Sequence, residues 1–260
     1  MIANAEAKKK LVKDAMDSIL YRHDEEATRS SFSEDFIQHN PMSADGIDHL
    51  VAMTQFTFVW EHARWIVDDD IVAYHGLYSS SNPLAPDSPL LCVDMWRVVD
   101  YDDDGQQKKI VEHWDALEIH PLGDLANLIA GKGDGLKAVK ATDVSKNKEI
   151  AIAFMHAKAN ANMEGMLALV NPDTFVHHAK DGHEDIGAVA TKGAVATKGA
   201  EDFDIKRTIG SGDLVMVHAH YKTSKKAAFD WFHLEDHKIV EHWIVTQDIA
   251  EETKNPHPHF

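Results

Sequence analysis

The pentapeptide IVEHW stands at residues 110–114 and again at residues 239–243. Upstream of each copy, three further blocks recur in the same order along the chain. FIQH at 36–39 parallels FVHH at 175–178, DDIVAYH at 69–75 parallels GDLVMVH at 212–218, and VDMWRV at 93–98 parallels FDWFHL at 229–234. Chance does not order four matched blocks in this way, so the sequence predicts two tandem copies of one domain of about 130 residues.

Within each copy, the pattern is typical of helices followed by an antiparallel meander. One helical face is marked by the spacing of Leu11, Val12, Ala15, Met16, Ile19 and Leu20. Residues 150–170, rich in Ala, Met and Leu, predict the corresponding helix of the second copy. Runs of β-branched and aromatic residues predict strands at 71–78, 91–99, 110–119, 214–222, 227–234 and 239–248. Polar clusters at 100–105 and 235–238 predict hairpin turns, and the whole pattern predicts an α+β fold.

The expected domains are residues 1–122 and 145–260, joined by a glycine- and lysine-containing linker at 123–144. GAVATK is repeated at 187–192 and 193–198, and we interpret this repeat as a lengthened helix or loop. A phosphate-binding role for its glycines is not expected, since the spacing of known phosphate-binding loops is absent.

Composition limits the classes of partner. With 26 basic and 43 acidic residues the formal charge is −17, which argues against binding to nucleic acid or to an anionic membrane. The chain has no apolar run long enough to span a bilayer, and its charged N-terminus does not resemble a signal peptide. A single cysteine, Cys92, cannot form an internal disulfide, so we expect a cytoplasmic protein. The 18 histidines leave metal binding and proton chemistry open.

Five motifs of the first copy together resemble the SnoaL-like polyketide cyclase family of the NTF2-like superfamily. They are HNP at 39–41, ADGI at 44–47, VAYH at 72–75, VDMWRV at 93–98 and IVEHWD at 110–115. The C-terminal residues 247–260 also resemble the tail that follows the final strand in bacterial members. The resemblance covers nearly the whole chain, once per copy, and implies two cones, each a strongly bent antiparallel sheet around a pocket. It does not fix the function, because this fold hosts enzymes of several classes and binding modules.

Strand alternation places three polar residues of the first copy in one cavity. His113 and Asp115 share one face of their strand, and Asp94 shares a face with Trp96 on the preceding one. In a mostly apolar pocket, a carboxyl group has a raised pKa and becomes a usable general acid or base near neutrality. Two such carboxyl groups suit enolisation next to a carbonyl, because one can take the α-proton while the other donates to the oxygen.

The resemblance assigns roles to these residues. It implies that Asp115 is the acid/base of a metal-free aldol closure and that Asn40 orients a carbonyl. Asp94 stands where the cyclases carry a pocket histidine, so we expect it to be the second catalytic carboxylate; the alternative is a structural ion pair with Arg97 or His113. The expected substrate-binding wall comprises Asn40, His39, His75, His113 and Trp96.

The second copy departs from the family pattern. Ile244 stands in place of Asp115 and Ala179 in place of Asn40, so we expect that this copy has lost the chemistry. Its expected pocket residues are His178, His218, Asp230 and His242. A Zn²⁺ or Cu²⁺ site that includes His220 is the alternative for these histidines; we expect no metal, because several of them repeat pocket histidines of the first copy.

The sequence therefore predicts a cofactor-independent cyclase- or isomerase-type enzyme that acts on a small apolar carbonyl compound in the first copy. The alternative is a small-molecule-binding protein without turnover. Single-domain relatives usually pair through the sheet, so we expect the two copies to form an intramolecular pseudo-dimer. Further association into a homo-oligomer is left open.

Overall fold

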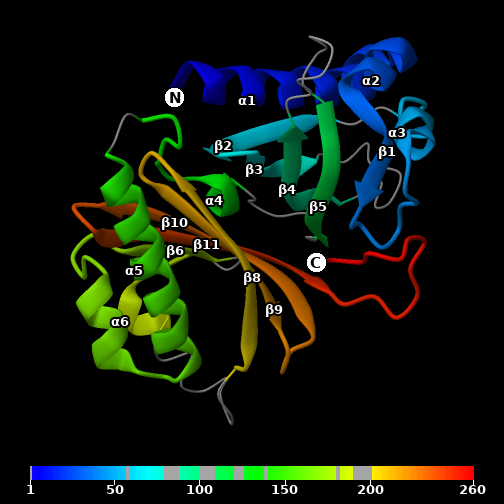
Figure 1. Ribbon diagram of the computed structural model, residues 1–260. Coiled ribbons are helices and arrows are strands. Elements are labelled where there is room, and N and C mark those ends of the chain that lie inside the picture. Colours follow the sequence, from blue (N-terminus) through cyan, green and yellow to red (C-terminus); the bar gives the residue numbers. More distant parts are fainter. Residues whose placement is uncertain are drawn as a thin grey trace. The chain divides into compact units, whose positions relative to one another are not determined.

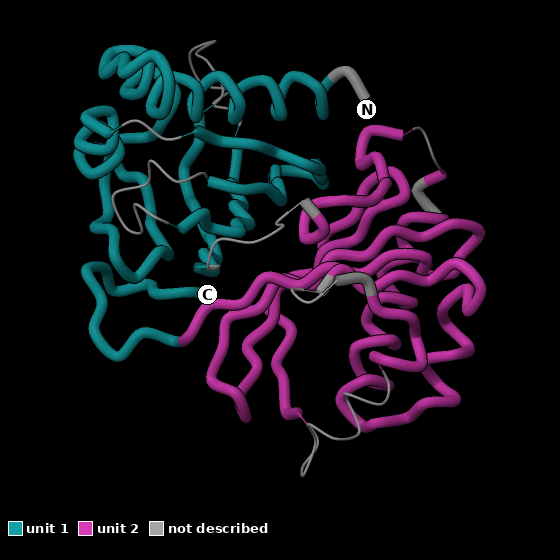
Figure 2. Tube along the Cα trace, turned by 180° about the vertical axis from the view of Figure 1, so that it is seen from behind, with its two compact units in different colours: residues 1–123, 249–260 teal, residues 124–248 magenta. Residues whose placement is uncertain are grey.

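The computed structural model describes residues 2–56, 59–78, 88–99, 109–119, 126–137, 140–179, 182–189 and 201–260. The chain divides into two units, residues 1–123 with 249–260 and residues 124–248 (Figure 2). Each unit combines helices with a mixed sheet (Figure 1), which confirms the predicted α+β class and tandem organisation. Among the described residues, no helix has both the length and the apolar character needed to cross a membrane.

The first unit opens with helices and continues into a five-stranded sheet of order β1-β5-β4-β3-β2. Its helical elements are α1 (Ile2–Asp17), the π-helical turn η1 (Ser18–Arg22), α2 (Glu25–Ser31) and α3 (Ile47–Met53). Its strands are β1 (Phe32–Gln38), β2 (Trp60–Asp68), β3 (Ile71–Tyr78), β4 (Leu90–Val99) and β5 (Lys109–Ile119). β1 runs parallel to β5 and the other pairs are antiparallel, so the sheet is mixed.

The predicted apolar face of the first helix is buried. Val12 and Ala15 are fully covered, and Met16 is 6% exposed. The chain then widens into the π-helical turn η1, which places Ile19 and Leu20 in the core. One helical face and the turn after it therefore supply an apolar wall against the sheet, where α1 contacts β2 and β3.

A glycine permits close contact between two strands of this sheet. A Cβ on Gly76 would lie 2.1 Å from the carbonyl oxygen of Glu61, so any larger residue would force β2 and β3 apart. The β2–β3 register shifts between His62 and Arg64, and a second irregularity separates Arg97 from Val98. Such bulges bend a strand and increase its twist, which is what a sheet that encloses a pocket needs.

The second unit repeats this plan with a six-stranded sheet of order β7-β6-β11-β10-β9-β8. Its helices are α4 (Ala126–Ile129), α5 (Ala141–Ala159) and α6 (Met163–Leu169). Its strands are β6 (Val176–Ala179), β7 (Gly182–Glu184), β8 (Phe203–Ser211), β9 (Leu214–Tyr221), β10 (Lys226–Glu235) and β11 (Lys238–Asp248). Helix α5 packs on this sheet through β8, β9 and β11. β6 is parallel to β11, as β1 is to β5.

All six predicted strands are present, with ends that differ by at most one residue. The turn at 235–238 is confirmed: Asp236 and His237 both have positive φ, as in the two-residue turns that match strand twist. The turn expected at 100–105 lies outside the described residues, as does most of the GAVATK repeat.

The helix expected at 150–170 is instead two helices. Ala161 has a φ of 51°, which interrupts α5, and the Asn162 side chain accepts a hydrogen bond from Gly165 N and caps α6. Asn favours a cap over a helix interior because its short amide side chain competes with the backbone for hydrogen bonds.

The unit boundaries differ from the expected domain boundaries at the C-terminal end. Residues 249–260 belong to the first unit, and α4 of the expected linker belongs to the second. Hydrogen bonds hold the tail in place: the buried Asn255 amide donates to Asn40 O at 2.6 Å and to Ser43 O at 2.8 Å. His259 N donates to His39 O at 2.7 Å. The carbonyl oxygens of the buried residues His39 and Asn40 thus obtain hydrogen-bond partners from the tail, as buried backbone groups need.

Candidate active site

The first unit contains a cavity of about 300 Å³, which lies between the helices, the sheet and the tail. Its apolar walls are Met16, Ile19, Leu20, Leu50, Met53, Leu90, Trp96 and Leu117, with Met42 and Phe56 also in the lining. Its polar lining residues include Gln38, Asn40, Tyr78, Asp94, His113 and Asp115. A mostly apolar chamber with a few convergent polar groups is the usual form of a small-molecule site.

Asp115 on β5 has one oxygen held and the other free. Asn40 Nδ2 donates to Asp115 Oδ2 at 2.6 Å. The orientation of the amide is fixed, because Asn40 Oδ1 accepts from Met42 N at 2.8 Å. Asp115 Oδ1 is buried and has no hydrogen-bond partner. An unpaired buried carboxylate oxygen is costly for the fold, and this cost is typical of functional groups.

Burial raises the pKa of Asp115 to about 6. The charge of Asp94 also raises the pKa, whereas His113 and the hydrogen bond from Asn40 lower it. At pH 7 such a group is about nine-tenths ionised, so it can both take and return a proton.

Asp94 and His113 share a proton, as the surrounding hydrogen bonds require. Gln38 Oε1 accepts from Asn40 N at 2.9 Å, which identifies this atom as the amide oxygen. His113 Nδ1, 2.8 Å from the same oxygen, must therefore carry a hydrogen. His113 Nε2 lies 2.9 Å from Asp94 Oδ1, and that contact needs a proton on one of the two atoms. The pair therefore holds a hydrogen-bonded proton close to Asp115.

Two tyrosines extend this network. Tyr78 Oη donates to Asp94 Oδ2 at 3.2 Å, and Tyr74 Oη lies 2.8 Å from Tyr78 Oη. Burial and the charge of Asp94 raise the pKa of both phenols well above the ordinary value. Both groups therefore remain protonated and serve as hydrogen-bond donors.

Asp94, His113 and Asp115 offer ligand atoms that all lie within 4.8 Å of one another, so these three residues could hold a metal ion. Their existing contacts also fit a metal-free network, because Asp94 is bonded to His113 and Asp115 to Asn40. The donor set alone therefore does not require a metal.

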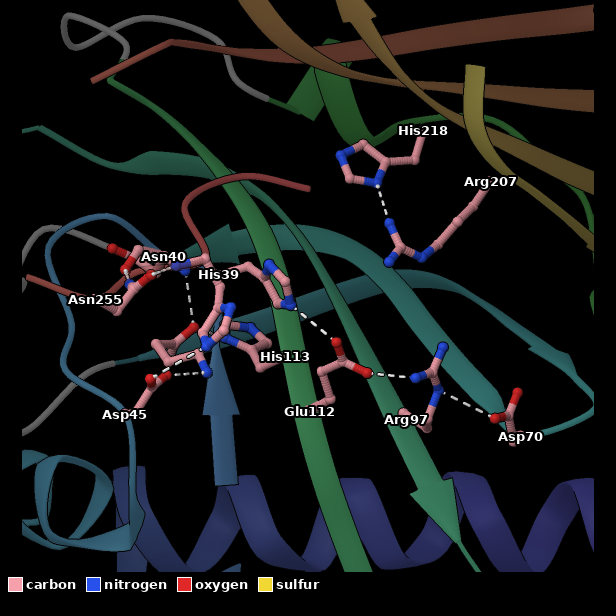
Figure 3. A network of polar contacts seen from close by, with 12 residues as sticks. His39, Asn40, Asp45, Asp70, Arg97, Glu112, His113, Arg207, His218 and Asn255 are labelled. Carbon is pink, nitrogen blue, oxygen red and sulfur yellow. Dashed lines mark hydrogen bonds and ion pairs between the residues drawn. The ribbon is translucent and has the colours of Figure 1, made fainter. Parts of the chain in front are cut away.

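His39 and His75, both expected in the substrate-binding wall, lie on the opposite face of the sheet. His39 stacks on Trp114 and lies 2.9 Å from Glu112, both of which alternate with the cavity residues His113 and Asp115. Figure 3 shows His39, Glu112, Arg97 and Asp70 joined in a row on this side.

His75 is fully buried and pairs with Arg64 on the neighbouring strand. It stands one residue after Tyr74, which is opposite Asp94 in the sheet. Because successive side chains point to opposite faces, His75 cannot share the cavity with Asp94. Of the expected residues, Asp94, Asp115, Asn40, His113 and Trp96 do line the cavity.

The second unit keeps part of this constellation. His242 Nε2 lies 2.9 Å from Asp230 Oδ1, the same distance as in the Asp94–His113 pair. Tyr221 donates to Asp230 Oδ2 at 2.7 Å, as Tyr78 does to Asp94. Burial works against the Asp230 carboxylate, yet the hydrogen bond from His242 lowers the pKa of Asp230 below its usual value. Ile244 and Ala179 stand where the first unit has its free carboxylate and the amide that orients it.

His178 and His218 lie on the other face of the second sheet from Asp230 and His242. His178 stacks on Trp243, and its Nε2 lies 3.3 Å from the acceptor Glu241 Oε1. His218 stacks on Phe229, next in sequence to Asp230. The histidines of the expected second pocket therefore do not converge on one point, since alternation separates them.

Sequence reasoning missed Gln38 and Tyr78. Gln38 belongs to the repeated FIQH block, but its counterpart in the second copy is a histidine, so the comparison of the two copies does not single out this position. Tyr78 ends β3 three residues after His75, on the cavity face, and its pairing with Asp94 comes from a neighbouring strand. Because side chains four residues apart share a face of a strand, Tyr78 lies on the same face of β3 as Tyr74, which is opposite Asp94. Strand alternation could therefore have identified Tyr78.

Residues 151–242 match the family model described as SnoaL-like domain. No curated protein matches the chain. Solved structures similar to it include an NTF2-like protein of unknown function from Burkholderia xenovorans, with 15% identity over 41% of this chain and 87% of that one, at a TM-score of 0.35. A protein from Kribbella flavida, provisionally named a ketosteroid isomerase, has 10% identity over 42% and 83% at 0.36. An LEH-like epoxide hydrolase from M. tuberculosis has 13% identity over 40% of this chain and 85% of that one, at a TM-score of 0.33.

Proposed function

We propose that this chain, whose residues 151–242 form a SnoaL-like domain, acts in its first unit as a cofactor-independent enzyme of the cyclase or isomerase type. The substrate is a small, mostly apolar carbonyl compound. The observation that carries the proposal is the free, buried Oδ1 of Asp115 beside the shared proton of Asp94 and His113.

The chemistry follows from the positions of these groups. Asp115 Oδ1 takes a proton from the carbon next to the carbonyl, and the electron pair of that C–H bond forms an enolate. The proton held between Asp94 and His113 stabilises or protonates the enolate oxygen, as preorganised donors do in other enzymes. The enol carbon then either attacks a second carbonyl group, which closes a ring and leaves an alkoxide that takes the proton from Asp115, or takes that proton back from Asp115 at another position. In both cases the proton lent to the enolate oxygen returns to the Asp94–His113 pair as the carbonyl re-forms.

The second unit supports the same reading by contrast. It retains Asp230, His242 and Tyr221 but carries Ile244 in place of the proton acceptor. Isoleucine cannot transfer a proton, so the reaction belongs to the first unit.

The test uses 1-tetralone, a neutral apolar ketone, and follows exchange of its α-hydrogens in D₂O by proton NMR. We expect catalysed exchange by the natural protein and a loss of about 100-fold or more in Asp115→Asn, the range that general acid–base catalysis contributes. Ile244→Asn, which introduces an asparagine at the matching position of β11, provides the control and should retain exchange. A chelator should leave the rate unchanged; a rate abolished by chelation and restored by Zn²⁺ would contradict the cofactor-independent mechanism.

The competing function is a binding module without turnover. A ketone held in the cavity, with α-hydrogens that exchange no faster than in buffer, would favour that function. Unchanged exchange in Asp115→Asn would refute the assignment of the base.

A further inference from the structure

The cavity carries a positive charge at a second point, away from its carboxylates. Lys254 from the C-terminal tail and His49 from α3 both line it. Lys254 is exposed, and Met42 and Phe56, which are 53% and 43% exposed, line the same cavity. These residues mark the mouth of the cavity.

Lys254 is held at this position by its neighbours. Its backbone N donates to Pro41 O at 2.8 Å, and the next residue, Asn255, is buried and bonded to two carbonyl oxygens of the 40–43 loop. The same loop carries Asn40, which orients Asp115. The tail therefore holds both Lys254 and the loop of Asn40, the amide that orients Asp115, with one set of contacts.

The charge of Lys254 is not used within the described part of the protein, where no acidic side chain forms an ion pair with it. In a chain with a formal charge of −17, an unengaged lysine at a cavity mouth is distinctive. His49 has a pKa lowered by burial and by Lys254, so at neutral pH it is uncharged and can still donate one N–H.

We propose that Lys254 and His49 bind a carboxylate group of the substrate at the mouth while the reacting carbonyl lies at Asp115. The substrate class is thus an apolar ketone that carries a carboxylate at one end. This inference rests on the proposed function for the position of the carbonyl, but its charge preference is a binding property. A terminal carboxylate would also keep the substrate's anionic end away from Asp94 and Asp115, whose charges would repel it.

The experiment compares 4-benzoylbutanoate with its neutral amide, 4-benzoylbutanamide, by isothermal titration calorimetry on the full chain. We expect the natural protein to bind the carboxylate about threefold to tenfold more tightly at low salt, as for a partly exposed ion pair, and less selectively at high salt. Lys254→Gln should bring the two dissociation constants within about twofold, and Lys254→Arg should restore the preference. Lys146→Gln, which removes an exposed lysine on α5, is the matched control for net charge.

Each other outcome overturns the proposal. These outcomes are a preference that survives in Lys254→Gln, an equal loss in Lys146→Gln, no preference in the natural protein, and no binding of either compound at millimolar concentration. Asp115→Asn separates the two proposals, because it should abolish proton exchange and keep the carboxylate preference. If the natural protein shows the carboxylate preference but catalyses no exchange, only the proposed function is refuted.

Discussion

Asp115 depends on a single amide for its orientation and for part of its acidity. Asn40 Nδ2 holds Oδ2 at 2.6 Å, and this hydrogen bond lowers a pKa that burial raises to about 6. Because the proposed base acts in its ionised form, the rate should rise with pH through that pKa. Removal of the amide in Asn40→Ala removes a lowering contribution, so the pKa must rise.

We therefore predict that Asn40→Ala moves the acidic limb of the rate–pH profile upward by about half a pH unit to one pH unit. The rate of the variant, as a fraction of the rate of the natural protein, should then be lower at pH 6 than at pH 8. The measurement is the pH dependence of 1-tetralone exchange. A limb that stays in place, or moves to lower pH, would show that Asn40 does not stabilise the carboxylate.

The positions of some of the expected site residues could be predicted from the sequence, and those of others could not. Alternation along β4 and β5 was enough to predict that Asp94, His113 and Asp115 meet, because both strands are regular there. It could not place His39, which follows the end of β1. The family resemblance places His75 in the cavity wall, whereas its position next to Tyr74 puts it on the other face of the sheet. The structure shows which of these residues line the cavity, and their roles stay predictions.

At the scale of elements, the sequence predicts strands β3, β4, β5, β9, β10 and β11 but not β1, β2, β6, β7 or β8. β1 contains Glu34 and Asp35, both exposed, and its strand character comes from parallel pairing with β5. Tertiary context overrides propensity in such a strand. The attachment of the tail at 249–260 could not be predicted either, because it consists of hydrogen bonds to a loop more than 200 residues earlier in the chain.

The tail should contribute measurable stability. Asn255→Ala removes two hydrogen bonds to carbonyl oxygens and leaves Asn40 O without this partner. We expect the free energy of unfolding to fall by about 1–3 kcal/mol, the cost of unmaking buried hydrogen bonds. Urea unfolding measures the change, and Glu252→Ala, an exposed position of the same tail, should change it by less than about 0.5 kcal/mol. Equal effects of the two substitutions would mean that the anchor is not at Asn255.

At the scale of the whole molecule, the duplication made the architecture predictable and also makes each unit a reference for the other. Both sheets carry a charged row on the face opposite the Asp–His pair. In the first unit, Arg97 stands between Glu112 and Asp70. In the second, His233 takes the place of the arginine, with Nδ1 at 2.8 Å from Glu241 and Nε2 at 3.6 Å from Asp213. An arginine keeps its charge at all working pH values, whereas a histidine can lose it.

This difference predicts how the stability of the chain depends on pH. Burial opposes the charged imidazole, yet the hydrogen bonds to Asp213 and Glu241 raise the pKa of His233 to about 9, above the ordinary 6.5. A group with a raised folded pKa stabilises fully below its unfolded value, and this contribution is lost as pH rises through the folded value. The free energy of unfolding should therefore fall by about 1–3 kcal/mol between pH 6.5 and pH 9.5. Unfolding by urea across this range measures the slope.

His233→Arg supplies the decisive comparison, because it gives the second unit the permanent charge that the first already has at Arg97. Arginine does not titrate in this range, so the slope between pH 6.5 and pH 9.5 should flatten to less than about half. His233→Gln should flatten the slope as well but lower stability at pH 6.5, since Asp213 and Glu241 lose their cation. If both variants keep the slope of the natural chain, the titrating group is not His233.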